Sequence, residues 1–248
     1  MTPLFAFQLR RVARNRQYLF FTVLLPALFT IFFTKIFGAQ AGTAAHYQDY
    51  ARYTMVSMMA YGAMGAALGA TIRISFDRAS GWLRQLRVTP VPQTQIVGVD
   101  VAVGALLTLP SLVVVALVGR FVNDVQLDLG TWLALIAVLW VGSIAFVALG
   151  LLLGLVLEEK AAGGAIGFVS VVLAALGGLW VPEEVFPQGM QGLAHAMPSY
   201  WYAQLGRDVA AGAAPSATAV LVMAGFTAAF GVLAVVVARR RPLYAVSG

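Results

Sequence analysis

The chain has 248 residues, of which 60% are apolar and only 10% are charged, and its mean hydropathy is +0.85. Soluble domains carry about 25% charged residues, so the composition excludes a soluble enzyme, a disordered chain and a nucleic-acid-binding domain. The net charge of +6 does not indicate nucleic acid, because the basic residues are scattered along apolar sequence. Cysteine is absent and the only histidines are His46 and His195, so neither a disulfide nor a metal site is expected.

Six apolar runs are long enough to cross a bilayer, whose core of about 30 Å requires about 20 helical residues. In chain order they lie at residues 18–37, 53–72, 96–119, 131–157, 161–181 and 216–238. The sequence therefore predicts an all-α integral membrane protein with six transmembrane helices, in which residues 1–248 form a single domain.

The basic residues predict the orientation of these helices. Twelve of the 16 fall on one side: Arg10, Arg11, Arg14, Arg16, Arg73, Arg78, Arg84, Arg87, Lys160, Arg239, Arg240 and Arg241. By the positive-inside rule this side is cytoplasmic, so both termini are expected in the cytoplasm. The start of the chain also resembles a signal peptide ending at Ala39-Gln40-Ala41, but the apolar run exceeds the usual signal core of about 7–15 residues.

Small residues and prolines predict how the spans pack. Glycines repeat at a spacing of four, which lets helix backbones approach closely in lipid, although glycine is simply common in this chain. Pro26 and Pro110 lie inside the first and third spans, where each removes a backbone hydrogen bond and should kink its helix. The glycine pairs are Gly65 and Gly69, Gly150 and Gly154, and Gly163 and Gly167.

Groups that could perform chemistry are scarce. Asp100 is the one carboxylate inside a predicted span, and its place near the cytoplasmic end favours a solvated helix-end group over a proton relay. No glycine-rich phosphate loop of the Walker type occurs, and no paired catalytic groups lie at depth in the predicted spans. Energy for uphill transport would have to come from another subunit. An ion-coupled transporter using Asp100 and a non-transporting scaffold or sensor partner remain alternatives.

The predicted cytoplasmic loop 73–95 carries an amphipathic pattern. Trp82, Leu83 and Leu86 recur at helical spacing, with Arg84 on another face, and Pro90 ends the helix. This segment either lies on anionic lipid as a basic interfacial helix or docks into a cytoplasmic partner.

The predicted outer segment 182–215 is too apolar for an ordinary exposed loop. Tyr200 and Trp201 favour the membrane interface, and non-helical backbone at depth must be buried in protein or line a cavity. A re-entrant hairpin or an interfacial helix is therefore expected. Glu183 should lie in a helical first turn after Pro182, where carboxylates are favoured, and His195 should be interfacial rather than catalytic.

Two motifs in these segments resemble the type-2 family of ABC exporter permeases. In that family an acidic-Arg pair, a glycine and Leu-x-x-Leu running to Thr-Pro mark the loop after the second span. A glycine, Pro-x-x-x-x-Pro and a further proline near a tyrosine mark the outer segment. The matching residues are Asp77, Arg78, Gly81, Leu83, Leu86, Thr89 and Pro90 in the loop, and Gly178, Pro182, Pro187, Pro198 and Tyr200 outside. Asp77 stands where glutamate is commoner.

The resemblance implies the permease half of an ATP-driven exporter. A basic interfacial helix would occupy residues 1–17. Two permease copies, or one copy and a paralogue, would bind two separate ABC ATPase subunits, and this chain itself would bind no cofactor and no nucleic acid. ATP and Mg²⁺ would bind to the partner ATPase.

The resemblance also implies roles for both motifs. The coupling helix that docks into the ATPase would contain Asp77, Arg78, Gly81, Trp82, Leu83, Leu86, Thr89 and Pro90. An outer gate would be shaped by Gly177, Gly178, Pro182, Glu183, Pro187, Pro198 and Tyr200. The expected substrate is hydrophobic or amphipathic, such as a drug or lipid. The chain is expected in a bacterial plasma membrane, where it would contact membrane lipid.

Overall fold

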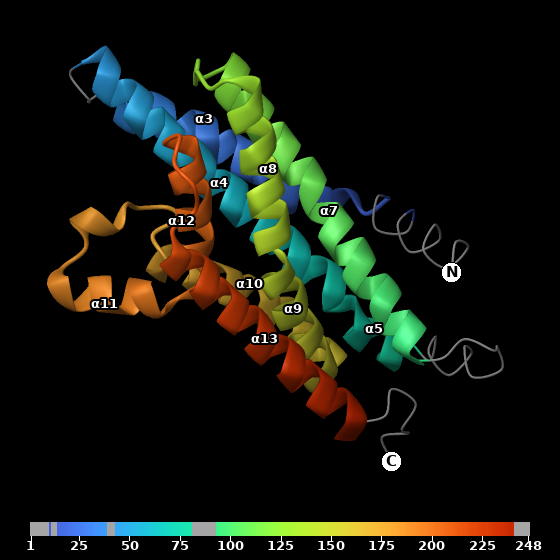
Figure 1. The fold of residues 1–248 in the computed structure, drawn as a ribbon. Coiled ribbons are helices and arrows are strands. Elements are labelled where there is room, and N and C mark those ends of the chain that lie inside the picture. The colour runs from blue at the N-terminus through green and yellow to red at the C-terminus, as the bar shows by residue number, and fades with distance from the viewer. Residues whose placement is uncertain (1–9, 11–13, 39–42, 81–92, 241–248) are drawn as a thin grey trace.

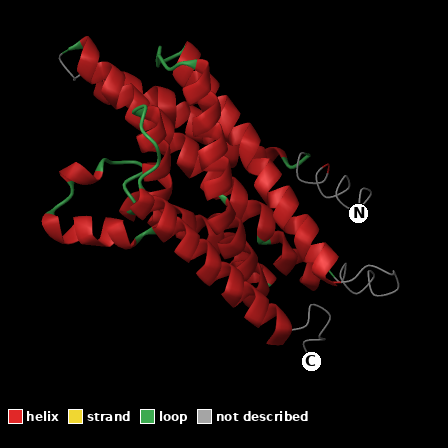
Figure 2. Ribbon diagram, viewed as in Figure 1, coloured by secondary structure: helices red, strands yellow, loops and turns green. Residues whose placement is uncertain are grey.

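A computed structural model describes the chain except for residues 1–9, 11–13, 39–42, 81–92 and 241–248. The described residues form helices joined by short loops, and no strand occurs among them (Figures 1 and 2). Six helical segments are long and apolar enough to span a membrane, which confirms the predicted number. They are Arg16–Phe37, Ala44–Asp77, Val97–Phe121, Leu129–Val156, Glu159–Leu176 and Ala217–Arg240.

Several spans are built from more than one helical element. The first contains α2 (Arg16–Leu19), a π-helical turn η1 (Phe20–Leu24) and α3 (Leu25–Phe37); the second contains α4 (Ala44–Thr71) and α5 (Arg73–Ala79). α7 (Gln93–Phe121), α10 (Glu159–Leu176) and α13 (Ala217–Arg240) are continuous, whereas α8 (Leu129–Gly142) and α9 (Ile144–Val156) meet at Ser143. The first span is thus interrupted just before Pro26 and the fourth at Ser143, whereas α7 runs through Pro110 without a break.

The first span is distorted just before its proline. Pro26 has no N–H to offer the carbonyl oxygen of Thr22, and the preceding turn widens so that Leu25 N–H donates to Phe20 O. The Tyr18 hydroxyl donates to the carbonyl oxygen of Ala66 at 2.8 Å. This bond anchors the start of the span to the C-terminal part of α4.

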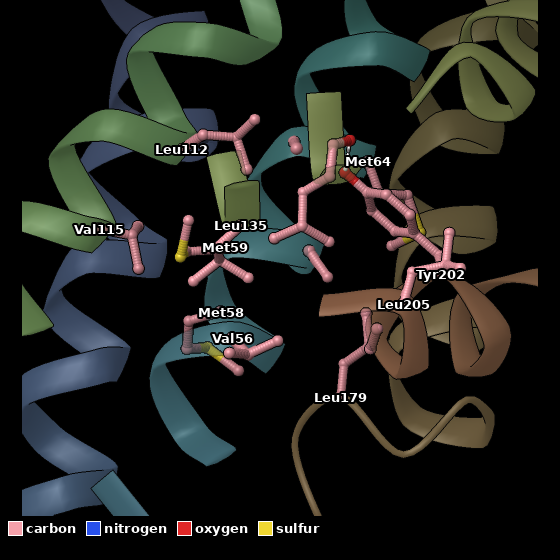
Figure 3. Packing of buried hydrophobic residues seen from close by; sticks show 14 of the residues in the cluster. Val56, Met58, Met59, Met64, Leu112, Val115, Leu135, Leu179, Tyr202 and Leu205 are labelled. Carbon is pink, nitrogen blue, oxygen red and sulfur yellow. Dashed lines mark hydrogen bonds between the residues drawn. The ribbon is translucent and has the colours of Figure 1, made fainter. Parts of the chain in front are cut away.

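α4 is the central helix of the molecule. In its most apolar stretch 83% of the residues are buried, and it packs against α3, α7, α9 and α12. Its buried methionines, including Met58, Met59 and Met64, meet Leu112 of α7 and Leu135 of α8 in the main core (Figure 3). Methionine is flexible enough to fill the irregular spaces between several neighbouring helices.

The helix ends gather at two ends of the molecule (Figure 1). α5 ends, α7 begins and α13 ends at one of them, which we call the Asp77 end. α3 ends, and α4 and α8 begin, at the other, which we call the Tyr53 end. The segment between α10 and α13 forms the turn η3 (Glu183–Val185) and the helices α11 (Gln188–Ala196) and α12 (Pro198–Ala210). α11 and α12 form a hairpin that turns at Met197.

The predicted boundaries differ from the structure most clearly at α4, α10 and α5. α4 begins at Ala44 rather than at residue 53, because Thr43 accepts a hydrogen bond from the His46 N–H and caps a polar first turn. α10 ends at Leu176 rather than at residue 181, because Gly178 adopts a positive φ of 71°, which a helix does not accommodate. Arg73–Ala79, predicted as part of a loop, is helical.

Candidate functional site

Of the predicted coupling residues, the structure describes Asp77 and Arg78, both on α5. Gly81, Trp82, Leu83, Leu86, Thr89 and Pro90 lie outside the described residues. Asp77 is 4% exposed, and α5 packs against α9 and α10. Asp77 is therefore packed inside the bundle in this chain.

Ile74 anchors α5 to the rest of the molecule. Its side chain is 1% exposed and packs with Leu151 and Leu155 of α9 and Ala234 of α13. Gly154 of α9 allows this close approach, because a Cβ atom at this position would lie 2.6 Å from Ile74 Cγ2. Ile74 therefore fixes α5 against α9 and α13.

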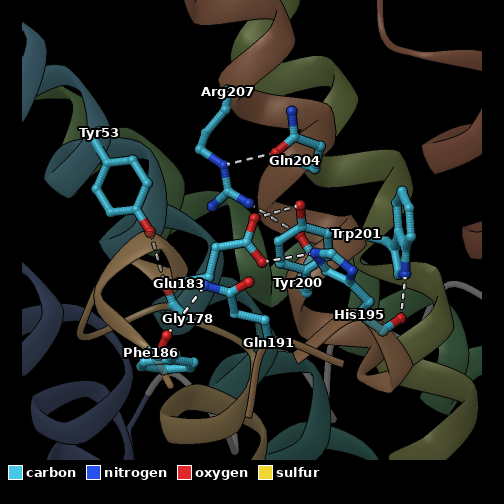
Figure 4. Close-up of polar contacts among 10 residues, drawn as sticks. All are labelled: Tyr53, Gly178, Glu183, Phe186, Gln191, His195, Tyr200, Trp201, Gln204 and Arg207. Carbon is cyan, nitrogen blue, oxygen red and sulfur yellow. Dashed lines mark hydrogen bonds and ion pairs between the residues drawn. The ribbon is translucent and has the colours of Figure 1, made fainter. Parts of the chain in front are cut away.

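Three of the predicted outer residues, Gly178, Glu183 and Tyr200, lie close to Tyr53 of α4 (Figure 4). The Glu183 carboxylate accepts a hydrogen bond from the Tyr200 hydroxyl at 2.8 Å and lies 2.8 Å from His195 Nε2. Three elements, η3, α11 and α12, are thus joined through one carboxylate. The predicted helical turn at Glu183 is confirmed as a 3₁₀ turn after Pro182.

The two glycines of this segment have separate structural roles. Gly178 adopts a left-handed conformation that other residues rarely take, and its carbonyl oxygen accepts a hydrogen bond from Tyr53 at 2.9 Å. Gly177 lies against α12, where Ser199 donates to the carbonyl oxygen of Leu173 at 2.6 Å. A Cβ atom at Gly177 would lie 2.6 Å from that oxygen, so the contact requires glycine.

The three predicted prolines begin or precede helical turns. Pro182 precedes η3, Pro187 precedes α11 and Pro198 is the first residue of α12. A proline is favourable at the start of a helix because its fixed φ matches the helix and its missing N–H would be unpaired there. The prolines thus set the bends of the hairpin, and Pro198 is buried against the rest of the bundle.

Arg207 extends this cluster, although we did not predict it. Its guanidinium carbon lies 5.3 Å from the ring centre of Tyr53 and 5.4 Å from that of Tyr200, which is cation–π geometry. Its Nε donates to Gln204 at 3.0 Å. Burial raises the pKa of the Tyr200 phenol, and the neighbouring Glu183 carboxylate raises it further, to about 12. The phenol therefore stays protonated and keeps donating its hydrogen bond to Glu183.

Two large grooves flank the bundle. One of about 580 Å³ runs between the first span, α4 and α10, and includes Tyr18, Thr22, Gly69 and Arg73 in its lining. The other, about 640 Å³ and almost wholly apolar, lies between α8 and α13. Grooves of this size, lined mainly by apolar residues with a few polar groups, suit hydrophobic or amphipathic molecules.

Among the described residues no group of three or more histidine, aspartate and glutamate side chains could hold a metal ion. The hydrogen bonds and cation–π contacts of Tyr53, Tyr200 and Arg207 instead join η3, α12 and the Gly178 turn to one another and to α4.

Comparison with known proteins identifies the family. Residues 42–236 match the model of the ABC-2 family transporter proteins. The chain is also 27% identical over 241 residues, covering 94% of this chain and 95% of the other, to a Bacillus subtilis (strain 168) protein named "Putative transport permease YvfS". Family membership implies a non-enzymatic, multi-pass transport subunit that works with an ABC ATPase. The chain belongs to the ABC-2 transporter family and is a transport permease of an ABC transporter.

Proposed function

We propose that this permease exports a hydrophobic or amphipathic substrate across the plasma membrane, driven by ATP that two copies of a separate ABC ATPase hydrolyse. The observation that carries the proposal is the path of α4 and α5. They form one nearly continuous helical span that leads from the predicted coupling segment, residues 77–90, to Tyr53 and its bond to Gly178. A displacement of the coupling segment would reach the outer gate along this buried span.

The orientation that the proposal requires agrees with the charge distribution. Arg73 and Arg78 lie at the Asp77 end together with Arg239 and Arg240 at the end of α13, so this end would face the cytoplasm. The Tyr53 end, with Tyr200 and Trp201, would face the outside. The coupling segment would then lie on the cytoplasmic side of the membrane, where an ABC ATPase could bind it.

The coupling segment can be tested by truncating one of its apolar anchors. We expect Leu86→Ala to lower ATP-driven uptake of a hydrophobic fluorescent dye into inverted vesicles about tenfold, without lowering the amount of permease in the membrane. Val88→Ala, in the same segment but outside the motif, is the matched control. Equal uptake by both variants and the unchanged chain would remove the coupling assignment.

The same assay distinguishes the ion-coupled alternative. If transport were driven by an ion gradient through Asp100, Asp100→Asn would abolish it, since no other carboxylate lies within a predicted span. In the ATP-driven account Asp100→Asn leaves most of the uptake intact, and uptake stops when ATP is withheld.

We further propose that two permease copies pair through their first and fifth spans. Both spans leave aromatic side chains uncovered: Phe32 is 54% exposed and Phe168 is 71% exposed. Because the chain has no cysteine, single cysteines can be crosslinked without background. Phe168→Cys should give a crosslinked pair in membranes, whereas Leu221→Cys on α13, also 71% exposed, should not. The opposite pattern would move the interface to α13.

A further inference from the structure

The apolar groove between α8 and α13 is large for a gap between two neighbouring helices. Its volume is about 640 Å³, whereas a protein cavity of about 150 Å³ is enough to hold a benzene molecule. Small residues contribute to both walls: Ala137 and Gly142 come from α8, and Ala224 and Ala228 come from α13. Their short side chains leave the space between the two helices unfilled.

The lining of the groove offers nothing to a polar ligand. Among its described lining residues none is charged, and the one polar side chain is Thr227. The Thr227 hydroxyl already donates to the carbonyl oxygen of Met223 at 2.8 Å, within the same helix. An apolar space of this kind does not retain water but does bind apolar molecules. The occupant should therefore be apolar along its whole length inside the groove.

The position of the groove favours a chain from the bilayer. Along α13 the lining residues run from Val220 to Ala228, which corresponds to a helix rise of about 12 Å. Half of a bilayer core of about 30 Å is about 15 Å, so the groove has nearly the length of one leaflet. The remaining surface of α13 is open to lipid, since Leu221 is 71% exposed. Hydrocarbon of matching length is thus available at the edge of the groove.

The groove also lies at the break in the fourth span. Gly142 and Ile144, which both line it, flank Ser143, where α8 ends and α9 begins. α8 packs mainly against α12, whereas α9 packs against α13 and α4. An occupant of the groove would contact the helices on both sides of the break and would brace α8 against α13.

We propose that this groove binds one acyl chain of a bilayer lipid, from the leaflet in which α13 begins. The protein would recognise the hydrocarbon chain and not the headgroup, because the lining carries no charge among its described residues. Lipid already solvates apolar groups, so the gain comes from packing, and a chain in the groove touches protein on several sides. The proposal depends neither on the direction nor on the substrate of transport.

The test is a native mass spectrometry titration of the purified, delipidated full chain in a non-ionic detergent. The main probe is methyl oleate, an acyl chain without a charged headgroup, and dioleoylphosphatidylcholine and dioleoylphosphatidylglycerol are compared with it. We expect saturable binding of all three with similar affinities, and a rise in melting temperature with each, since a ligand that binds the folded state stabilises it. If methyl oleate does not bind saturably, the proposal is overturned, whichever headgroup binds.

Variants that fill the groove then locate the binding. Ala224→Phe and Ala137→Phe each place a ring in the groove, from opposite walls, and each should weaken binding about tenfold. Ala229→Phe on α13 and Ala134→Phe on α8 are the matched controls, because both alanines are exposed and lie outside the lining. Ala137 and Ala224 are exposed as well, so the filled variants should fold and keep their melting temperature without ligand. Equal affinities in filled and control variants would overturn the site.

A second copy of the chain is the competing occupant. Because the chain has no cysteine, Ala224→Cys tests it without background. We expect no crosslinked pair from Ala224→Cys in membranes. A crosslinked pair would place a second copy at the groove and would overturn the assignment to lipid.

Discussion

α4 and α13 are both long membrane-spanning helices, yet they have opposite environments. In the most apolar stretch of α4 83% of residues are buried, against 11% in that of α13. α4 is the less apolar of the two and carries small, polar and methionine residues, whereas α13 is rich in valine, leucine and alanine. High hydropathy, as in α13, thus indicates a helix that faces lipid. Burial inside the bundle, as in α4, depends instead on side chains that allow close and irregular packing.

The glycines of the two helices differ in the same way. A Cβ atom on Gly62 of α4 would lie 3.0 Å from Pro26 Cγ and 3.0 Å from the carbonyl oxygen of Thr22, while Gly225 and Gly231 of α13 have nothing within 4 Å. Gly62 of α4 is thus a packing requirement, whereas Gly225 and Gly231 of α13 are not. Substitutions on the two helices should therefore have effects of different size.

The largest difference is expected for truncation of a buried side chain. Met59→Ala should lower the free energy of unfolding by about 2 kcal/mol, the lower end of the range for such changes, because lipid already solvates apolar groups and mainly packing is lost. Leu233→Ala, whose side chain is 49% exposed, is the control and should cost less than about 0.5 kcal/mol. Unfolding in mixed micelles measures both, and equal losses would contradict the distinction.

Adding a single methyl group should have a somewhat smaller effect. Gly150→Ala places a Cβ atom 2.9 Å from Leu68 Cα and 3.0 Å from its carbonyl oxygen, which should destabilise the protein by about 1–2 kcal/mol through overpacking of α9 against α4. Gly231→Ala places its methyl group in free space, and alanine has a higher helix propensity than glycine. The free energy of unfolding of this variant should therefore be unchanged or slightly higher. A loss in both variants would show that glycine matters on α13 as well.

Removing one hydroxyl group should lower the free energy of unfolding by about 1 kcal/mol in the core and by almost nothing on α13. The Tyr202 hydroxyl is fully buried and donates to the carbonyl oxygen of Leu139 at 2.7 Å, so Tyr202→Phe loses one long-range hydrogen bond. Thr227→Val on α13 removes only a bond to Met223 within the same helix. Thermal melting in detergent compares the two, and a larger effect of Thr227→Val would count against the prediction.

The smallest effect concerns the polar end of α4, where Tyr53 meets the hairpin. The pKa of Tyr200 rises from the usual value of 10.0 to about 12. Its folded pKa is above its unfolded one, so the stabilisation is fully present below pH 10 and is lost as the pH rises towards 12. The ultraviolet difference titration between the unchanged chain and Tyr200→Phe should have its midpoint near pH 12, and Glu183→Gln should lower it. A midpoint near 10 in the unchanged chain would contradict the burial of this phenol.

Local sequence patterns predicted the spans well but not all of their limits. Hydropathy located six spans because each needs about 20 apolar residues. It missed the polar first turns of α4, since His46, Asp49 and Arg52 lower the average although the backbone stays helical. The adjacent pair Gly177-Gly178 could have signalled the end of α10. The break between α8 and α9 had no comparable signal, because Ser143 is an ordinary residue that bonds to the Trp140 carbonyl oxygen.

Long-range contacts at the candidate site could not be predicted from spacing. Tyr53 and Gly178 are 125 residues apart in the sequence, and only the fold brings them together. Glycine repeats were a partial guide: Gly150 and Gly154 do pack against the second span, whereas Gly163 and Gly167 have nothing within 4 Å. The roles assigned to residues 81–90 rest on the family resemblance and remain predictions.

The central claim is that this permease works with a separate ABC ATPase held through the coupling segment. Purification of the tagged chain from native membranes in mild detergent, with mass spectrometry of the proteins that accompany it, tests this claim most directly. We predict a stoichiometric ABC ATPase that is lost when Leu83 and Leu86 are both changed to Asp. Intact chain recovered repeatedly without an ATPase, or an ATPase retained by the double variant, would contradict the account.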